Sequence, residues 1–224
     1  VSHNGFELDK YFKTDDLKKC SRFWIILFKT ILSKLYHWKI YVVGSVEYQY
    51  PNHLFQAGYF LDKKYYDENT IDFKHLLLSE KNQSLLKDIQ NSNSVGVHIR
   101  RGDYMTKQNL VIFGNICTQK YYHDAIRIIT EKVNDAVFYV FSDDISWVQT
   151  HLDIPNAVYV NWNTGESSIY DMYLMSSCKY NIIANSTFSY WAARLNKKTN
   201  MVIYPSKWYN TFTPDIFPES WCGI

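Results

Sequence analysis

The sequence lacks the residue spacings that mark a metal site or a disulfide framework. Its four cysteines (Cys20, Cys117, Cys178 and Cys222) include no Cys-x-x-Cys pair, and its seven histidines include no His-x-x-x-His pair. Zinc sites and disulfide-stapled domains depend on clusters of that kind. We therefore expect reduced thiols and no bound metal.

An excess of charge and a long apolar run are missing as well. Lys and Arg total 24 against 22 for Asp and Glu, and the net charge of +2 excludes a uniformly basic nucleic-acid binder while leaving room for a local basic pocket. The longest uncharged apolar run near the start, residues 23–28, is far shorter than a membrane span, and no signal peptide is expected. With 46% hydrophobic residues among 224, the chain can form one large domain or two small ones.

A polar break, Asn-Ser-Asn-Ser, divides the chain into a first part, residues 1–93, and a second part, residues 94–224. In the first part, helical periodicity predicts a helix over residues 18–38 with a basic stripe opposite an apolar one. Such a helix usually packs its apolar stripe on a core, and the alternative is contact with a membrane surface. The first part also contains a predicted strand, 40–48, and a predicted helix, 76–90, with Ser79 as its N-cap.

The second part alternates between strands and helices. Its strands are continuously apolar, which is typical of a parallel sheet covered by helices on both faces. This predicts a doubly wound α/β domain, in which ligands bind beyond the carboxyl ends of the strands. The predicted strands are 94–99, 136–141, 157–160, 180–184 and 201–204, and the predicted helices are 119–133, 145–152, 167–178 and 187–195.

Two arginines follow the first strand of this domain. Arg100 and Arg101 offer planar, permanently charged forks that suit phosphate, and Gly102 allows a sharp turn or a close approach. Asp103 can hold an arginine in place or accept a hydrogen bond from a sugar hydroxyl. A surface loop with a structural Arg–Asp pair is the alternative, but the position at a strand's carboxyl end favours an anion site.

Two acidic residues, Asp143 and Asp144, follow the strand over 136–141. A carboxylate at such a strand end commonly accepts hydrogen bonds from a nucleoside. Two alternatives remain open: Asp143 could cap the next helix, or the pair could bind a metal. The metal is the weaker alternative, because adjacent side chains diverge and no third ligand is evident.

A helix start follows the strand over 180–184. Ser186 or Thr187 is a suitable N-cap, and the free N–H groups and partial positive charge of a helix start suit a diphosphate. An ordinary capped helix is the alternative. Because the arginines, the carboxylates and this helix start all follow strand ends, together they predict a pocket for a nucleoside diphosphate.

At this point the residues resemble a known family. His98-Ile99-Arg100-Arg101-Gly102-Asp103-Tyr104 resembles the signature of the α-1,2-fucosyltransferases of the bacterial and blood-group-H type. Phe141-Ser142-Asp143-Asp144 resembles the family's second motif, and residues 181–193 resemble the third. The similarity extends over most of residues 55–208, in the family's order, through further matches at 58–66, 121–126, 175–179, Pro205 and Trp208.

The resemblance implies a GT-B type glycosyltransferase with a Rossmann-like parallel-sheet donor domain, residues 94–224, and an acceptor-side α/β domain, residues 1–93. It implies inverting transfer of L-fucose from GDP-β-L-fucose to the 2-hydroxyl of a terminal β-galactoside, without a cofactor or an essential metal. The family begins with a Gly-rich stretch containing Gly-Asn-Gln, which does not occur before residue 55, so we expect the acceptor-side domain to be incomplete. The chain also departs from the family at Tyr190, where Trp is usual, and at Leu61-Asp62.

The same resemblance implies roles for individual residues. Arg100 would bind the β-phosphate and act in catalysis, with Arg101 and Asp103 supporting the loop. Asp103 is also a candidate general base, although positioning the arginine is the favoured role. The rest of the implied donor site comprises His98 and Asp143 at the guanosine, Ser186, Thr187 and Phe188 at the diphosphate, and the adjoining Asp144 and Asn185.

Other functions stay open. The chain could be an inactive GDP-sugar or glycan-binding module, or a fucosyltransferase with another acceptor, such as a peptide hydroxyl. A nicotinamide-dependent dehydrogenase is disfavoured because no Gly-x-Gly-x-x-Gly follows a strand. We expect a cytoplasmic bacterial enzyme of O-antigen biosynthesis that acts on a lipid-linked glycan, with the helix over 18–38 as the candidate contact to the inner face of the membrane.

Overall fold

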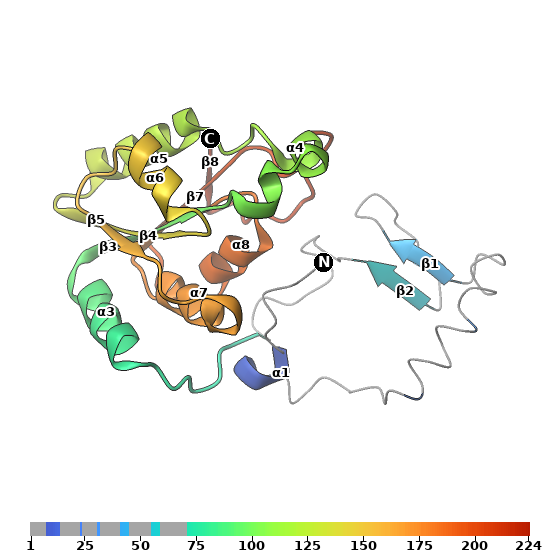
Figure 1. Ribbon diagram of the computed structural model, residues 1–224, viewed down its shortest axis with the longest axis horizontal. Coiled ribbons are helices and arrows are strands. Elements are labelled where there is room, and N and C mark those ends of the chain that lie inside the picture. Colours follow the sequence, from blue (N-terminus) through green and yellow to red (C-terminus); the bar gives the residue numbers. More distant parts are fainter. Residues whose placement is uncertain (1–7, 14–22, 24–30, 32–40, 45–54, 59–70) are drawn as a thin grey trace. The chain divides into compact units, whose positions relative to one another are not determined.

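The computed structural model (Figure 1) describes residues 8–13, 23, 31, 41–44, 55–58 and 71–224. The described residues fall into two compact units. The larger unit holds residues 8–13, 71–213 and 218–224, and the smaller one holds the remaining described residues. Residues 71–93, which the predicted domain boundary grouped with the acceptor side, therefore lie in the same unit as the main sheet.

A six-stranded sheet forms the centre of the larger unit, and every pair of neighbouring strands is parallel. The predicted parallel α/β class is thereby confirmed. The strand order is β5-β4-β3-β6-β7-β8. The strands are β3 (Asn93–Ile99), β4 (Ala136–Ser142), β5 (Ala157–Val160), β6 (Tyr180–Ile182), β7 (Met201–Tyr204) and β8 (Cys222–Gly223).

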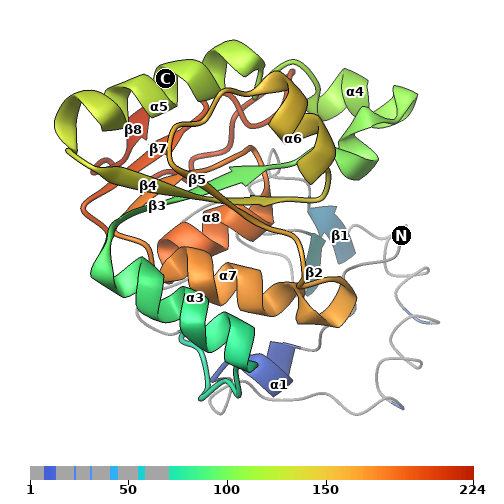
Figure 2. The same ribbon diagram turned by 60° about the vertical axis from the view of Figure 1, so that its left-hand side comes forward.

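Helices cover both faces of this sheet, as Figure 2 shows, with α4, α5 and α6 on one face and α3, α7 and α8 on the other. Burial on two sides explains why the strands are apolar at successive positions, since Val97 on β3 pairs with Val140 and Ile182 and all three are buried. The helices are α1 (Leu8–Tyr11), α3 (Glu80–Asn91), α4 (Lys107–Phe113), α5 (Gln119–Lys132), α6 (Ile145–His151), α7 (Ser168–Ser176) and α8 (Thr187–Arg194), with short 3-10 turns η2 (Gly102–Met105) and η3 (Gly165–Ser167).

The order of the strands creates a switch point between β3 and β6. From β3 the chain proceeds through β4 to β5 on one side, and it then returns to the other side of β3 for β6, β7 and β8. At such a switch point the loops that leave the two neighbouring strands diverge and open a crevice beyond their carboxyl ends. In this sheet the residues after Ile99 and after Ile182 are the ones that leave the two strands flanking the switch point.

One predicted helix cap is confirmed, and one predicted strand is shorter than expected. Ser79 is the N-cap of α3, and its hydroxyl accepts a hydrogen bond from the backbone N–H of Asn82 at 3.3 Å. The strand predicted over 180–184 ends at Ile182, because the N–H of Ala184 already donates to the Ser189 hydroxyl as the chain turns into α8.

The helix α4 was not predicted from the sequence. Its apolar side chains do not point into a core, since Val111 is 73% exposed, and its first turn is polar. Thr106 caps it by accepting from the N–H of Asn109, and the Asn210 amide donates to the carbonyl oxygens of Val111 and Gly114. The Thr106 cap and the distant Asn210 thus stabilise this helix. Neither produces the periodic apolar pattern from which a helix is predicted in a sequence.

The smaller unit contains two parallel strands, β1 (Tyr41–Gly44) and β2 (Phe55–Gly58), with Tyr41 paired to Phe55. The strand predicted over 40–48 is confirmed for Tyr41–Gly44, and β2 was not predicted. The helix predicted over 18–38 lies outside the described residues except for Phe23 and Ile31, whose side chains are exposed. In the described part of the chain, no helix is both long enough and apolar enough to cross a membrane.

Candidate active site

Arg100, the first residue after β3, lies between two carboxylates. Its Nη2 is 2.6 Å from Oδ1 of Asp103, and its Nη1 is 2.9 Å from Oδ2 of Asp143. The Asp103 side chain is 52% exposed, whereas that of Asp143 is 27% exposed. Both ends of the guanidinium fork are therefore engaged, one by a well-hydrated carboxylate and the other by a more enclosed one.

Gly102 allows the Asp143 carboxylate to approach this loop closely. A Cβ atom at position 102 would collide with Oδ2 of Asp143. The other oxygen of Asp143 accepts a hydrogen bond from the backbone N–H of Arg101 at 2.9 Å. Asp143 thus fixes both the backbone of the loop and the side chain of Arg100.

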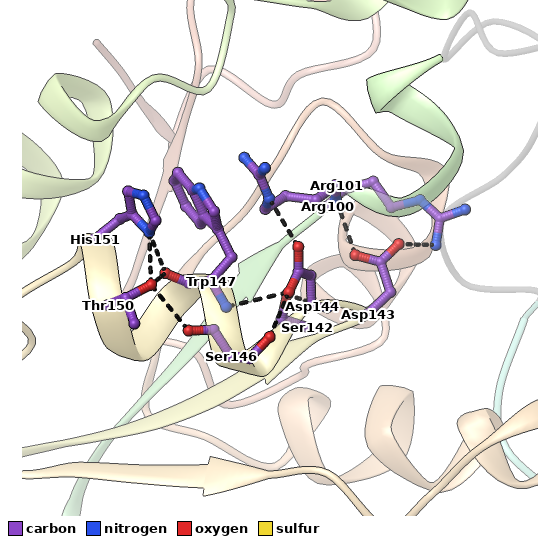
Figure 3. Close-up of polar contacts among 9 residues, drawn as sticks. All are labelled: Arg100, Arg101, Ser142, Asp143, Asp144, Ser146, Trp147, Thr150 and His151. Atoms are coloured by element: carbon purple, nitrogen blue, oxygen red, sulfur yellow. Dashed lines mark hydrogen bonds and ion pairs between the residues drawn. The ribbon is translucent and has the colours of Figure 1, made fainter.

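Arg101 points to the opposite side of the loop from Arg100, as Figure 3 shows. Its Nε lies 3.2 Å from Oδ2 of Asp144, and its guanidinium carbon lies 3.7 Å from the centre of the Trp147 ring. The Trp147 ring in turn stacks on His151 at 4.6 Å. Among the described residues none pairs with the two terminal nitrogens of Arg101, which point away from Asp144 in Figure 3.

Asp144, not Asp143, caps the helix α6. Its Oδ1 accepts hydrogen bonds from the Trp147 backbone N–H at 3.1 Å and from the Ser146 hydroxyl at 3.0 Å. The pKa of Asp144 is lowered by the Trp147 N–H first, and also by the Ser146 hydroxyl and Arg101. The suggestion that Asp143 is the cap is therefore wrong. As for the metal alternative, the described residues contain no group of three potential ligands.

The start of α8 has no side-chain cap. Ser186 occupies the N-cap position, but its hydroxyl makes no capping hydrogen bond, and Thr187 is exposed. The hydroxyl of Ser189 instead ties the preceding loop together by accepting from the Ala184 N–H at 3.2 Å. Free N–H groups at a helix start carry partial positive charge and bind anions.

Asn185 turns its side chain into the protein. Its amide donates to the carbonyl oxygens of Phe113 and Trp208, and its side-chain oxygen accepts from the Cys117 thiol. Its role is therefore to shape the loop before α8, and its side chain is occupied.

Two contacts join the arginine loop to the start of α8 across the switch point. The Tyr104 hydroxyl donates to the carbonyl oxygen of Asn185 at 2.9 Å. The His98 ring lies 5.1 Å from the ring of Phe188. The structure thus brings the predicted residues of the first and third motifs together, as the strand order requires.

His98, on β3, is buried and neutral. Burial, with a smaller contribution from Arg100, lowers its pKa to about 3. Its Nδ1 has no hydrogen-bond partner among the described residues. A buried ring nitrogen without a partner is uncommon and marks a position at which a ligand can supply the missing hydrogen bond.

Asp171, on α7, is a buried carboxylate that was not predicted as a site residue from the sequence. Burial raises its pKa to about 7, and the Asn163 amide donates to its Oδ1 at 2.6 Å. Asn163 in turn exchanges hydrogen bonds with Asn82 on α3. A lone Asp in the first turn of a helix gives no sequence signal that separates a buried carboxylate from a solvated one.

The profile of glycosyl transferase family 11 matches residues 13–224, a span that includes the arginine loop, the two aspartates after β4 and the start of α8. The chain belongs to this family. The resemblance stated from the motifs is thereby confirmed.

The chain spans between 40% and 63% of the length of the three relatives described here. An Escherichia coli alpha-1,2-colitosyltransferase is 35% identical over 196 residues, which cover 81% of this chain and 63% of the relative. The O-antigen biosynthesis glycosyltransferase WbnK of Escherichia coli is 44% identical over 122 residues, which cover 54% of this chain and 40% of the relative. Galactoside alpha-(1,2)-fucosyltransferase 2 of Pongo pygmaeus is 28% identical over 163 residues, covering 67% of this chain and 48% of the relative.

Among solved structures, this chain is similar to the fucosyltransferase NodZ from Bradyrhizobium. One NodZ structure is matched over 84% of this chain and 62% of that chain, with 14% identity and a TM-score of 0.43. A second, co-crystallised with GDP, is matched over 58% of this chain and 43% of that chain, with 17% identity and a TM-score of 0.40.

Proposed function

We propose that this chain forms the donor site of an inverting fucosyltransferase that transfers L-fucose from GDP-β-L-fucose to the 2-hydroxyl of a terminal β-galactoside. The observation that carries the proposal is the meeting of the arginine loop with the open start of α8 at the switch point, joined by Tyr104 and Asn185. Nucleotides bind at switch points of parallel sheets, and phosphates bind at helix starts. Membership of glycosyl transferase family 11 supports the same reaction class, and the proposal includes a two-domain GT-B arrangement.

The chemistry needs a cation at the leaving group. Breaking the bond between fucose and GDP builds negative charge on the β-phosphate, and a fixed guanidinium stabilises it. In this proposal Arg100 exchanges the exposed Asp103 for a phosphate oxygen while Asp143 keeps its hold on Nη1. The start of α8 adds N–H groups and the hydroxyls of Ser186 and Thr187, so no metal ion is required.

Two further roles in the proposed reaction are contact with the guanosine and removal of the acceptor's proton. The unpaired Nδ1 of His98 is available to the guanosine, whereas both oxygens of Asp143 are occupied by the arginine loop. Inverting transfer also requires a base that removes the proton of the acceptor 2-hydroxyl. Asp103 either supplies that base after it leaves Arg100 or serves only to position the arginine.

A second candidate is colitosyl transfer. It is favoured by the 35% identity over 196 residues to an alpha-1,2-colitosyltransferase, which exceeds the identity to the galactoside fucosyltransferase of Pongo pygmaeus. The arginine loop and the helix start would serve either sugar, since they address the diphosphate. The proposal includes a cytoplasmic reaction on a lipid-linked glycan, with residues 18–38 as the candidate contact to the membrane surface.

The test is to incubate the chain with GDP-fucose and a panel of β-galactosides, with and without EDTA, and to determine the linkage of the product by NMR. We expect fucose on the 2-hydroxyl and equal rates with and without EDTA. Loss of the product in EDTA would contradict the metal-free chemistry. GDP binding without transfer to any acceptor would instead support the inactive binding module, and turnover of a colitose donor alone would support the second candidate.

A further inference from the structure

We propose that Tyr104 is a positioning residue that couples the arginine loop to the start of α8, so that both engage one diphosphate together. This inference rests on the proposed function, because the ligand that it concerns is the GDP of the donor. Tyr104 lies in η2, directly after the arginine loop, and the carbonyl oxygen that it contacts belongs to Asn185, 81 residues further along the chain. It is the one side-chain hydrogen bond that spans the switch point between these two segments in the described part of the chain.

The surroundings of Tyr104 hold its ring in one place. The ring stacks on Phe113 with a centroid distance of 4.6 Å and an interplanar angle of 15°. The guanidinium carbon of Arg100 lies 5.7 Å from the same ring, within the range of a cation–π contact. Tyr104 therefore contacts both the helix α4 and the proposed catalytic cation.

The hydroxyl of Tyr104 is a hydrogen-bond donor at every physiological pH. Burial raises the pKa of this phenol, so it does not ionise and repel the carbonyl oxygen of Asn185. That carbonyl belongs to the residue directly before the N-cap Ser186, so its position sets the direction in which the free N–H groups of α8 point. A shift of either partner changes the distance between the arginine fork and the helix start, which a single diphosphate has to bridge.

The matched experiment compares Tyr104→Phe with Tyr139→Phe. Both changes remove one hydrogen-bonded phenol hydroxyl and keep the ring, but the Tyr139 hydroxyl contacts Ser92 at 3.0 Å, away from the switch point. We expect both variants to lower the melting temperature by a similar few degrees. Only Tyr104→Phe should weaken GDP binding, measured by calorimetry, by about tenfold, which corresponds to one hydrogen bond's contribution.

A double-mutant cycle separates positioning from general destabilisation. If Tyr104 acts by aligning the two anion-binding elements, the effects of Tyr104→Phe and Ser186→Ala on GDP affinity are not additive. Additive effects, or GDP affinity of Tyr104→Phe within twofold of the wild type, would overturn the inference while the wild type still binds GDP. A wild-type chain that binds no GDP would instead overturn the proposed function, so the two failures are distinguishable.

Discussion

The two flanks of the candidate active site are prepared for an anion in different ways. On the β3 side, Arg100 is neutralised by Asp103 and Asp143, and the three carboxylates of the cluster outnumber its two arginines. On the β6 side, the start of α8 has no side-chain cap and no acidic residue in its first turn. The first flank thus has strong charges that are already paired, and the second has weak partial charges that are open.

This difference indicates an order of engagement. A phosphate can meet the start of α8 without displacing any group, but it reaches Arg100 only by replacing Asp103. Because the Asp103 side chain is more exposed than that of Asp143, we expect the exchange in the proposed reaction at the Nη2 end of the fork. In that proposal the start of α8 contacts the diphosphate first, and Arg100 changes its partner afterwards.

The largest effect is expected when the fork of the β3 flank is removed. Arg100→Lys should lower kcat/KM with GDP-fucose by about 10²–10³-fold, because a point charge cannot hold Asp143 and a phosphate oxygen together. The matched control is Arg127→Lys, since Arg127 also lies between two carboxylates, Asp124 and Glu131, on the outer surface of α5. Steady-state kinetics measure both variants, and retention of most activity by Arg100→Lys would refute its role at the leaving group.

A smaller effect is expected from crowding the same flank. Gly102→Ala should weaken GDP binding by about 10–100-fold, since the new methyl group collides with the Asp143 carboxylate and shifts the loop. Placing the same change in an Asp143→Ala background removes the collision. Calorimetry should then find that Gly102→Ala costs little more in that background, and an undiminished cost there would point to a different cause.

On the α8 flank the expected effect is smaller still. Ser186→Ala should weaken GDP binding by about fivefold, the contribution of one hydroxyl, while leaving the free energy of unfolding nearly unchanged because this hydroxyl caps nothing. Ser79→Ala is the converse, since it removes a working cap and should cost about 1 kcal/mol of stability without affecting GDP. Urea unfolding and calorimetry on both variants test the contrast, which fails if Ser186→Ala is the more destabilised of the two.

The effect that is smallest near neutral pH concerns His98, which lies between the two flanks. Between about pH 6.5 and its folded-state pKa of about 3, only the unfolded chain binds a proton, so the stability falls as the pH falls. The loss should be below about 1 kcal/mol at pH 6 and should grow by about 1.4 kcal/mol per pH unit below that. His98→Gln should flatten this dependence in urea unfolding at pH 5, 6 and 7, and an unchanged slope would contradict the assignment.

Much of the larger unit could be predicted because burial on both faces leaves an unmistakable sequence pattern. The apolar run at 136–141 and the short run at 157–160 became β4 and β5 within one residue of their predicted ends. The helix α4 could not be predicted, since its hydrogen bonds to Asn210 come from nearly a hundred residues away and its apolar side chains are exposed. The hydrophobic pattern of a segment reflects its burial, but it contains no information on hydrogen bonds from distant residues.

The residues of the site were predictable, but their pairing was not. Arg100, Asp143 and Ser186 follow the carboxyl ends of neighbouring parallel strands. The alternation of strands and helices in the sequence is sufficient to predict this placement. Whether Asp143 or Asp144 caps α6 depends on side-chain directions at a strand end, as does the divergence of Arg100 and Arg101 seen in Figure 3. Neighbouring residues with the same chemistry cannot be distinguished before those directions are known.

The switch point also has a consequence for how the molecule is made. During synthesis, β3, β4 and β5 emerge in succession and can pair with short loop closures, so the ion pairs of Arg100 and Arg101 are available early. The strand β6 begins about 80 residues after β3 ends, and the contact from Tyr104 to Asn185 forms when it joins β3. Since pairings between distant segments are slow steps of folding, we expect the ion pairs of the arginine loop to form before its contact with the start of α8.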